Sequence, residues 1–216
     1  MSNRKENILE IAIELFNEKG CMNTSTRHIA DNLGISVGNL YYYFKNKEDI
    51  IIALYEDFMV SLSKQLTSVT DGIDEPFDFY GFLDEQMELE RKYRFIRLEM
   101  GNLYSTYPKV KAALEIGFEK KQVEIKRLFL HQIKYDYLIK LDRSELEYLC
   151  SNVWIIGSQW EIFWIVHKVG NEKLRRFQGE LNFLYFIKPY VTKKGLEKSN
   201  LLKSIEYVKK EIENVK

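Results

Sequence analysis

The sequence is poor in the residues that form disulfides, metal sites and helix breaks. It contains two cysteines, Cys21 and Cys150, which are far apart and belong to no CxxC or paired-histidine spacing. Neither a disulfide framework nor a zinc site is indicated, and we expect both thiols to be reduced. The chain of 216 residues has three prolines and eleven glycines, and long stretches without either favour a mostly helical protein.

The chain also lacks the segments that direct a protein to a membrane. No uninterrupted apolar run approaches the roughly 18 to 20 residues of a membrane span. The N-terminal stretch MSNRKENILEIAIELF carries charges every few residues and has no apolar signal-peptide region. We therefore expect a cytoplasmic protein with no membrane partner.

Patterns typical of catalysis are missing as well. The three histidines, His28, His131 and His167, are scattered along the chain. No Ser/His/Asp set, metal-ligand spacing or glycine-rich phosphate loop accompanies them. We predict no catalytic residue, no metal and no cofactor, and hence that the protein is not an enzyme. For His28 we expect a place at the edge of a core or beside a phosphate.

An excess of positive charge is absent too. The chain has 32 basic and 32 acidic side chains, and residues 1–47 hold six basic against five acidic ones, a net of 6 − 5 = +1. Bulk attraction to a polyanion is therefore not indicated, and DNA binding would depend on where individual charges lie.

Residues 24–47, TSTRHIADNLGISVGNLYYYFKNK, predict two short helices joined by a tight turn. Apolar residues before the turn share one helical face: Ile29, Ala30 and Leu33. Gly34 tolerates the positive φ of a turn, and Ser36 can cap a second helix from Val37 to about Phe44. This is the helix-turn-helix arrangement, which places its second helix in the DNA major groove.

A preceding helix is predicted from about Arg4 to Lys19, with Gly20 at its C-terminal cap. Its apolar face consists of Ile8, Leu9, Ala12, Leu15 and Phe16. We expect this helix to close a three-helix core over Ile29, Leu33, Leu40 and Phe44, with Thr24 or Ser25 capping the second helix.

The second helix of the motif has an unusual outward face. At about 100° per residue, Leu40 and Phe44 point to the core and Tyr42 points away from it. The flanks and edges of that outward face are Gly38, Asn39, Tyr41 and Tyr43. Such a face suits DNA, because Asn can bond an adenine edge, Tyr hydroxyls can reach phosphates and Gly allows close approach. A tyrosine-rich protein interface is the alternative.

A family resemblance is carried by Ile8, Leu9, Ala12, Leu15, Phe16 and Gly20, and then by Ile29, Ala30, Gly34, Ser36, Leu40, Tyr41, Phe44 and Lys47. Over about residues 4–50 the chain resembles the N-terminal domain of TetR/AcrR-type transcriptional regulators. The resemblance implies a homodimeric repressor with an N-terminal three-helix domain that binds a palindromic double-stranded operator. It also implies a larger helical domain that dimerises and binds a small-molecule effector.

The resemblance assigns roles to single positions. Arg27 would contact a base or a phosphate, and Thr26 and Tyr41 would anchor phosphates. Tyr42 and Tyr43 would face the groove, and Lys47 would contact the DNA backbone. The predicted DNA-binding set is Thr26, Arg27, Ser36, Val37, Gly38, Asn39, Tyr41, Tyr42, Tyr43 and Lys47. Val37 departs from the polar or basic residue common at its position, and can only pack against a thymine methyl.

The predicted domains are residues 1–46, which bind DNA, and residues 47–216, which bind the effector and dimerise. The second domain should begin with a long helix to about Thr67. A turn is predicted at residues 70–75, with Pro76 in the first position of the next helix. Three helices should follow, at 76–92, 93–106 and 108–131.

This all-α domain is rich in aromatic residues, which either form its core or line an effector cavity. By resemblance we predict an effector pocket formed by Phe79, Leu83, Met87, Phe95, Tyr104, Phe118, Trp154, Trp160, Glu161 and Trp164. Arg91, Arg94 and Arg97 are more typical of a solvated or ion-paired face than of a ligand clamp, although an anionic effector would suit them.

Three further helices are predicted. The most apolar, 142–169, should be buried nearly all round, with Glu161 either contacting an effector or, as we favour, paired across a subunit interface. By resemblance this helix and the next, 172–188, form a four-helix dimer interface. A last amphipathic helix, 196–216, should pack on its own subunit or on the partner, rather than on a membrane surface.

The sequence thus predicts a DNA-binding transcriptional repressor released by an effector. One alternative is a helical small-molecule binding protein without DNA activity, and a more remote one is a helical enzyme.

Overall fold

The computed structural model describes residues 4–68 and 76–215. In this part of the chain every secondary-structure element is a helix, and a single isolated β-bridge joins Leu138 and Val191. The all-α prediction is therefore confirmed. None of the described helices combines the length and apolar character needed to cross a membrane.

The chain folds into two compact units. One consists of residues 1–62 and 89–119, and the other of residues 63–88 and 120–216. Residues 89–119 therefore belong with the N-terminal helices, although they lie far along the chain. The division of the chain into domains 1–46 and 47–216 stays a prediction.

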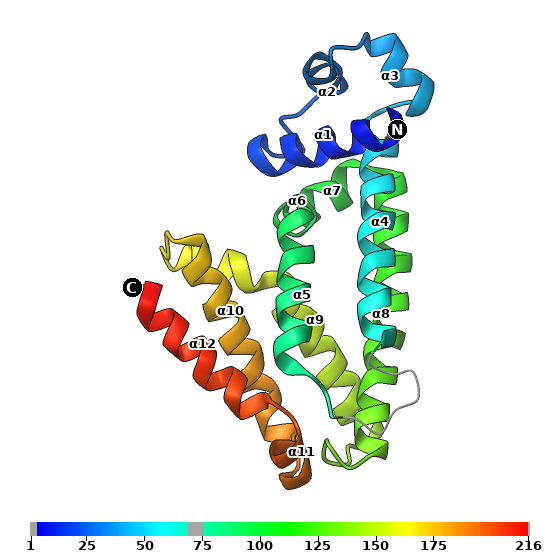
Figure 1. The fold of residues 1–216 in the computed structure, drawn as a ribbon. Coiled ribbons are helices and arrows are strands. Elements are labelled where there is room, and N and C mark those ends of the chain that lie inside the picture. Colours follow the sequence, from blue (N-terminus) through cyan, green and yellow to red (C-terminus); the bar gives the residue numbers. More distant parts are fainter. Residues whose placement is uncertain (1–3, 69–75, 216) are drawn as a thin grey trace. The chain divides into compact units, whose positions relative to one another are not determined.

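The first unit contains the predicted helix-turn-helix (Figure 1). Its helices are α1 (Arg4–Lys19), α2 (Thr26–Leu33), α3 (Val37–Tyr43), most of α4 (Lys47–Ser68), the end of α5 (Phe79–Lys92), α6 (Arg94–Leu98), α7 (Met100–Thr106) and the start of α8 (Pro108–Lys134). The predicted first helix is confirmed, and Gly20 follows it with φ +85°. Phe16 of α1 packs against Phe95 of α6, with ring centroids 5.1 Å apart.

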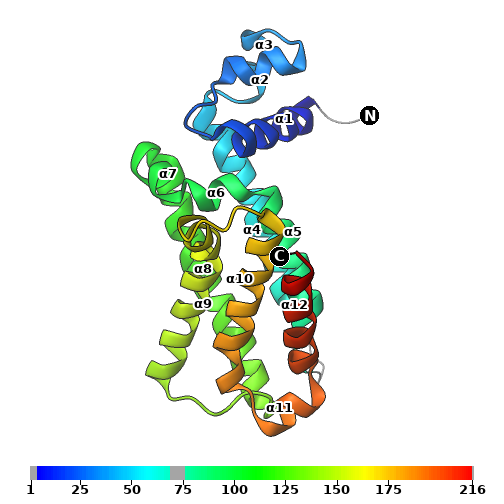
Figure 2. The same ribbon diagram turned by 90° about the vertical axis from the view of Figure 1, so that its left-hand side faces the viewer.

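The second unit holds the remaining parts of α4, α5 and α8. It also contains α9 (Arg143–Val166), α10 (Glu172–Ile187), the 3-10 turn η1 (Lys188–Tyr190), α11 (Lys193–Lys198) and α12 (Leu201–Val215). Helix α10 lies between α9 and α12, and contacts both (Figure 2).

The prediction that Pro76 opens a helix is wrong. Helix α5 begins at Phe79, because Asp78 caps it: the Asp78 carboxylate accepts the Gly81 N–H at 3.0 Å. The Phe79 N–H donates to the side-chain oxygen of Asn200 at 2.9 Å. The turn predicted at residues 70–75 lies outside the described residues.

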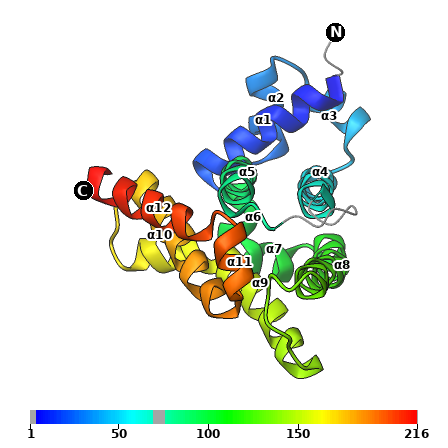
Figure 3. The same cartoon turned by 60° about the horizontal axis from the view of Figure 1, so that its bottom comes forward.

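The helix predicted over 93–106 is two helices, because the backbone at Glu99 leaves the helical region, with φ −112° and ψ 12°. The helix predicted over 196–216 is likewise divided. Helix α11 ends at Lys198, and α12 starts at Leu201 beside α10 (Figure 3). The apolar stripe of α12 is buried against its own chain, as one of the two alternatives predicted. The stripe consists of Leu201, Ile205, Val208 and Ile212.

The prediction that the helix over 142–169 is buried nearly all round is wrong for a single chain. Helix α9 exposes apolar side chains along much of its length: Tyr148, Ile155, Phe163, Ile165 and Val166. Its opposite side, with Leu149 and Trp160, is buried in the second core. Apolar residues thus surround α9 as predicted, but only one side of it meets the same chain.

Both cysteines are free and buried. Burial raises the pKa of the Cys21 thiol to about 12, an effect that Lys47 opposes and Glu99 reinforces. Burial also raises the pKa of Cys150 to about 11. At pH 8 both groups are therefore thiols, which are poor nucleophiles.

We predict that the folded protein at pH 8 reacts slowly with a thiol reagent such as dithionitrobenzoate. In the denatured chain both cysteines should react rapidly. Rapid reaction of the folded protein at either cysteine would contradict this burial, and the absorbance of the released thiolate measures it directly.

Candidate nucleic-acid interface

Helix α2 is fixed at its start by a reciprocal cap. The Ser25 hydroxyl accepts the His28 N–H at 3.2 Å, and the Ser25 N–H donates to Nδ1 of His28 at 3.3 Å. Two backbone donors that the helix leaves open are thereby satisfied. The exposed His28 is thus a capping residue, a role that the sequence analysis did not anticipate.

The turn between α2 and α3 has the predicted geometry. Gly34 adopts φ +63°, a left-handed conformation that favours glycine. Ser36 caps α3, and its hydroxyl accepts the Asn39 N–H at 3.1 Å. Leu40 is fully buried and Phe44 nearly so, which fixes the side of α3 that faces the core.

The outward face of α3 is led by Tyr42, whose side chain is 83% exposed. Gly38 and Asn39 are exposed beside it. Tyr41 is 47% exposed, and its hydroxyl lies 3.2 Å from Oγ1 of Thr26 on α2. These two side chains therefore form a hydroxyl pair between the two helices of the motif.

Two residues of the predicted DNA-binding set are less available. Val37 and Tyr43 are half-buried and pack against the first core. The ring of Tyr43 meets that of Tyr42 edge to face, with centroids 5.1 Å apart. Tyr43 therefore supports Tyr42. Of the three tyrosines predicted on the outward face, only Tyr41 and Tyr42 are exposed.

Lys47 is engaged inside the protein. Its ammonium donates to the Cys21 carbonyl at 2.8 Å and to the Thr24 carbonyl at 3.0 Å, and lies 5.6 Å from the centre of the Tyr107 ring. It thereby holds the loop between α1 and α2 against the start of α4. Two of the three donors of this ammonium are used, which leaves one for a phosphate.

Two side chains that could not be predicted from the sequence attach α1 and the loop after it to residues 92–99. The Glu99 carboxylate accepts the N–H groups of Cys21 and Met22, at 2.5 and 3.1 Å. The Asn17 side chain accepts the Phe95 N–H at 2.9 Å and donates to the Lys92 carbonyl at 2.8 Å. No local pattern marks such contacts, because the partners are more than 70 residues apart.

A third attachment joins the start of α4 to the start of α8. The Lys109 N–H donates to the Glu48 carboxylate at 2.7 Å, and the Lys109 ammonium lies 3.4 Å from the Asp49 carboxylate. The helix-turn-helix is thus tied to residues 92–109 by several charged or polar contacts within one compact unit.

The predicted effector residues are divided between the two compact units, and the pocket stays a prediction. Phe95, Tyr104 and Phe118 belong to the first unit, where Phe95 is in the core and the other two are exposed. The other predicted residues belong to the second unit: Phe79, Leu83, Met87, Trp154, Trp160, Glu161 and Trp164. Among all of them, Leu83 lines a cavity of about 230 Å³ between α5, α10 and α12.

Two predicted polar positions have partners in their own chain. Glu161 is 2% exposed and its carboxylate lies 3.8 Å from the Arg175 guanidinium, so this ion pair links α9 to α10 and does not cross a subunit interface. Arg97 is buried and paired with Glu90 at 2.5 Å. Among the described residues, no group of three or more His, Cys, Asp or Glu side chains could hold a metal ion.

Family comparisons agree with this geometry. A family described as bacterial regulatory proteins, tetR family, matches residues 8–54, and one described as bacterial transcriptional repressor matches residues 55–198. The chain belongs to the TetR family. The first match covers the whole helix-turn-helix, and the second covers most of the remaining helices.

This TetR-family chain is 31% identical over 77 residues to the HTH-type transcriptional repressor KstR2 of Mycolicibacterium smegmatis. The aligned residues are 36% of this chain and 38% of that protein. It is 38% identical over 69 residues to the HTH-type transcriptional regulator YttP of Bacillus subtilis, with 32% and 33% covered. The chain thus matches between 33% and 38% of the length of these relatives.

Solved structures extend the likeness to the whole chain. A TetR-family transcriptional regulator from Marinobacter aquaeolei VT8 is similar with a TM-score of 0.82 and 25% identity, over 96% of this chain and 99% of that one. KstR2 of Mycobacterium tuberculosis is similar in fold, with a TM-score of 0.61 and 19% identity over 89% and 97%.

We predict that Glu99→Ala lowers the free energy of unfolding by about 1.5 to 3 kcal/mol, because two backbone donors lose a charged acceptor. The exposed Glu119→Ala, in the same unit, is the matched control and should change it by less than about 0.5 kcal/mol. Urea unfolding measures both, and equal effects would contradict the role of Glu99.

Proposed function

We propose that this protein is a sequence-specific DNA-binding transcriptional regulator that acts as a repressor in the cytoplasm. The observation that carries the proposal is the outward face of α3. Tyr42 is 83% exposed there beside an exposed Asn39, on a helix fixed by the Ser36 cap and the Gly34 turn. A helix face with exposed aromatic and amide side chains, and without Lys or Glu, is better suited to contact a DNA groove than to remain exposed to solvent.

The proposed contacts follow from where each side chain lies. Asn39 and Tyr42 read base edges, and Gly38 lets the backbone approach. Tyr41 and Thr26 hold a phosphate through their paired hydroxyls, and the exposed Arg27 adds a base or phosphate contact. The full proposed set remains Thr26, Arg27, Ser36, Val37, Gly38, Asn39, Tyr41, Tyr42, Tyr43 and Lys47, in which Val37 and Tyr43 mainly support the face.

We propose that the protein is a homodimer through α9 and α10. The support is the apolar side of α9, where Ile155, Phe163 and Val166 are more than half exposed. Tyr185 of α10 is exposed as well. A symmetric pair of chains would cover these residues and present two copies of α3, which calls for a palindromic operator with half-sites one helical turn or a multiple apart.

The proposed switch uses the attachments inside the first unit. Because Asn17, Glu99 and Lys109 connect residues 92–109 to α1 and α4, a ligand that displaced α6 or the start of α8 would also move the reading helices. Helices α5 and α8 have residues in both units, so a small effector bound in the second unit can act on this segment through continuous helices. In this scheme effector binding changes the half-site spacing and releases the operator.

We predict that Tyr42→Ala weakens binding to the protein's own upstream DNA by about 1 to 3 kcal/mol and lowers its preference over unrelated DNA. Tyr135→Ala, which removes a tyrosine of the second unit outside the proposed contacts, is the control and should leave both quantities unchanged. Mobility shifts on the two DNAs measure them. Loss of affinity for both DNAs in equal proportion would argue against base reading by Tyr42.

We predict that Lys47→Met weakens binding to all DNAs alike, and reduces the slope of log K against log salt by about 0.9, the value for one phosphate contact. It should also destabilise the fold, because the Cys21 and Thr24 carbonyls lose a charged donor. Lys45→Met, at an exposed neighbour, is the matched control for stability. If the Lys47→Met slope stayed at the wild-type value, Lys47 would be a structural residue alone.

A further inference from the structure

The cavity between α5, α10 and α12 has an apolar floor and an aromatic mouth. Its volume is about 230 Å³, and the floor consists of Leu83, Phe177, Leu184 and Val208. At the mouth the rings of Tyr80 and Tyr207 meet edge to face, with centroids 5.1 Å apart. Both tyrosines are partly exposed, so the cavity is open to solvent.

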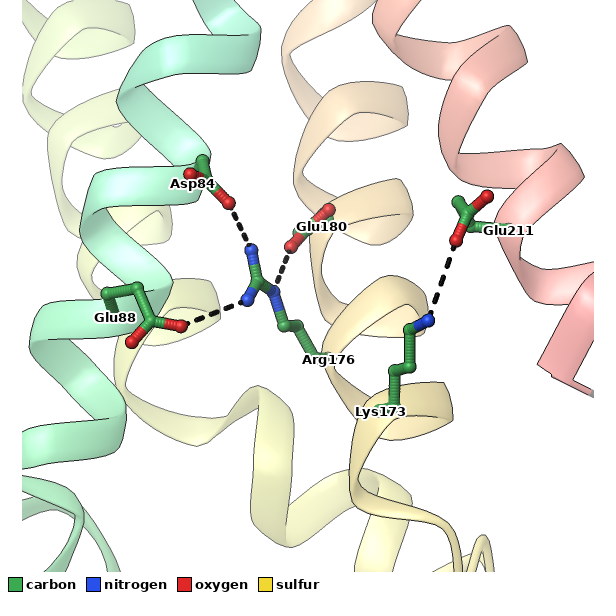
Figure 4. A network of polar contacts seen from close by, with 6 residues as sticks. All are labelled: Asp84, Glu88, Lys173, Arg176, Glu180 and Glu211. Carbon is green, nitrogen blue, oxygen red and sulfur yellow. Dashed lines mark hydrogen bonds and ion pairs between the residues drawn. The ribbon is translucent and has the colours of Figure 1, made fainter.

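One wall of the cavity is charged, and Arg176 lies at its centre (Figure 4). The Arg176 guanidinium contacts Asp84 at 2.6 Å and Glu88 at 3.3 Å on α5, and Glu180 at 2.8 Å on its own helix. Each of its three nitrogens is thereby directed at a carboxylate.

A second ion pair completes this wall, with the Lys173 ammonium 3.7 Å from the Glu211 carboxylate of α12. The wall as a whole is acidic. Its three lining carboxylates, Asp84, Glu180 and Glu211, stand against the two cations Lys173 and Arg176, a formal balance of 2 − 3 = −1.

The carboxylate of Glu180 is the most deeply buried of this wall. The residue is 4% exposed, and burial raises the pKa of its carboxyl group even though Arg176 opposes the effect. An added cation in the cavity would offset this cost. An anion would meet the same wall with repulsion.

Tyr207 contributes no further charge. A hydrogen bond with Tyr80, followed by burial, raises the pKa of Tyr207 to about 12, so this phenol is neutral at physiological pH. Neutral rings beside carboxylates offer both a cation–π surface and hydroxyl oxygens to a cation.

We propose that this cavity binds a small organic cation with a primary ammonium group on an apolar body. The ammonium donates to the carboxylates of Asp84 and Glu211 beside the tyrosine rings, and the apolar body lies against Leu83 and Phe177. The volume suits such a ligand, because an apolar cavity of about 150 Å³ accommodates benzene. Arg176 stays in place, held by its three carboxylates.

That this cation is the effector rests on the proposed function. That it binds in the cavity does not depend on the proposed function. Leu83 is the residue that the cavity shares with the effector pocket predicted from the sequence. A cation bridging α5 and α12 would act on α5, which continues from the second unit into the first.

The test is calorimetric titration of the full chain with 2-phenylethylamine at low ionic strength, without DNA. We expect saturable binding of one amine per chain at millimolar concentration or below. The isosteric 2-phenylethanol and the anion 3-phenylpropionate should bind at least about tenfold more weakly. An amine that fails to saturate, or an alcohol that binds as tightly, would overturn the proposal.

Two matched variants locate the bound amine. Glu211→Gln removes a carboxylate of the wall, and Glu213→Gln makes the same change at an exposed position on α12 outside the lining. We expect about a tenfold loss of amine affinity for Glu211→Gln and none for Glu213→Gln. Equal affinities of the two variants would place the amine elsewhere. The Lys173–Glu211 pair is partly exposed and 3.7 Å apart, so its loss should lower the stability of the fold only slightly, and thermal unfolding of both variants checks this.

Mobility shifts with and without amine then separate the two proposals. We expect saturating 2-phenylethylamine to change operator affinity severalfold, and unchanged affinity would remove the effector role. A chain that binds amine but never shifts its upstream DNA would count against the proposed function and leave the cavity proposal supported.

Discussion

The packing of Phe16 against Phe95 is the contact on which the position of α3 depends. Phe16 belongs to α1, which closes the core under α2 and α3, so whatever holds α1 also holds Tyr42. Asn17 and Glu99 add backbone hydrogen bonds on either side of the aromatic pair. A small reading head with little net charge is thereby fixed to residues 92–109, and its direction can be changed only together with them.

The features that could be predicted from the sequence are local. The Gly34 turn, the Ser36 cap and the outward Tyr42 each depend on residues within one or two helical turns, which spacing alone reveals. The partners of Glu99 and Lys47 could not be predicted, because they are 78 and 26 residues away and have no periodicity. Apolar periodicity shows which side chains of a helix are apolar, but not whether the same chain covers them. For this reason α9 was predicted to be buried nearly all round.

The region predicted to bind an effector was the least predictable part of the molecule. Aromatic residues there serve mainly as core, and the predicted set falls into two units. The charged residues that form the cavity wall, such as Asp84 and Arg176, have the spacing of a solvated helix surface. Their convergence arises from the packing of α5, α10 and α12 and leaves no mark in any single helix.

Hydroxyl-radical footprinting of the protein's upstream DNA would show whether two copies of α3 read a symmetric operator. We expect protection in two patches related by a twofold axis, with centres one helical turn or a multiple apart, and a stoichiometry of two chains or a multiple of two per site. Protection of a single asymmetric patch by one chain, or no protection at low salt, would contradict this proposal.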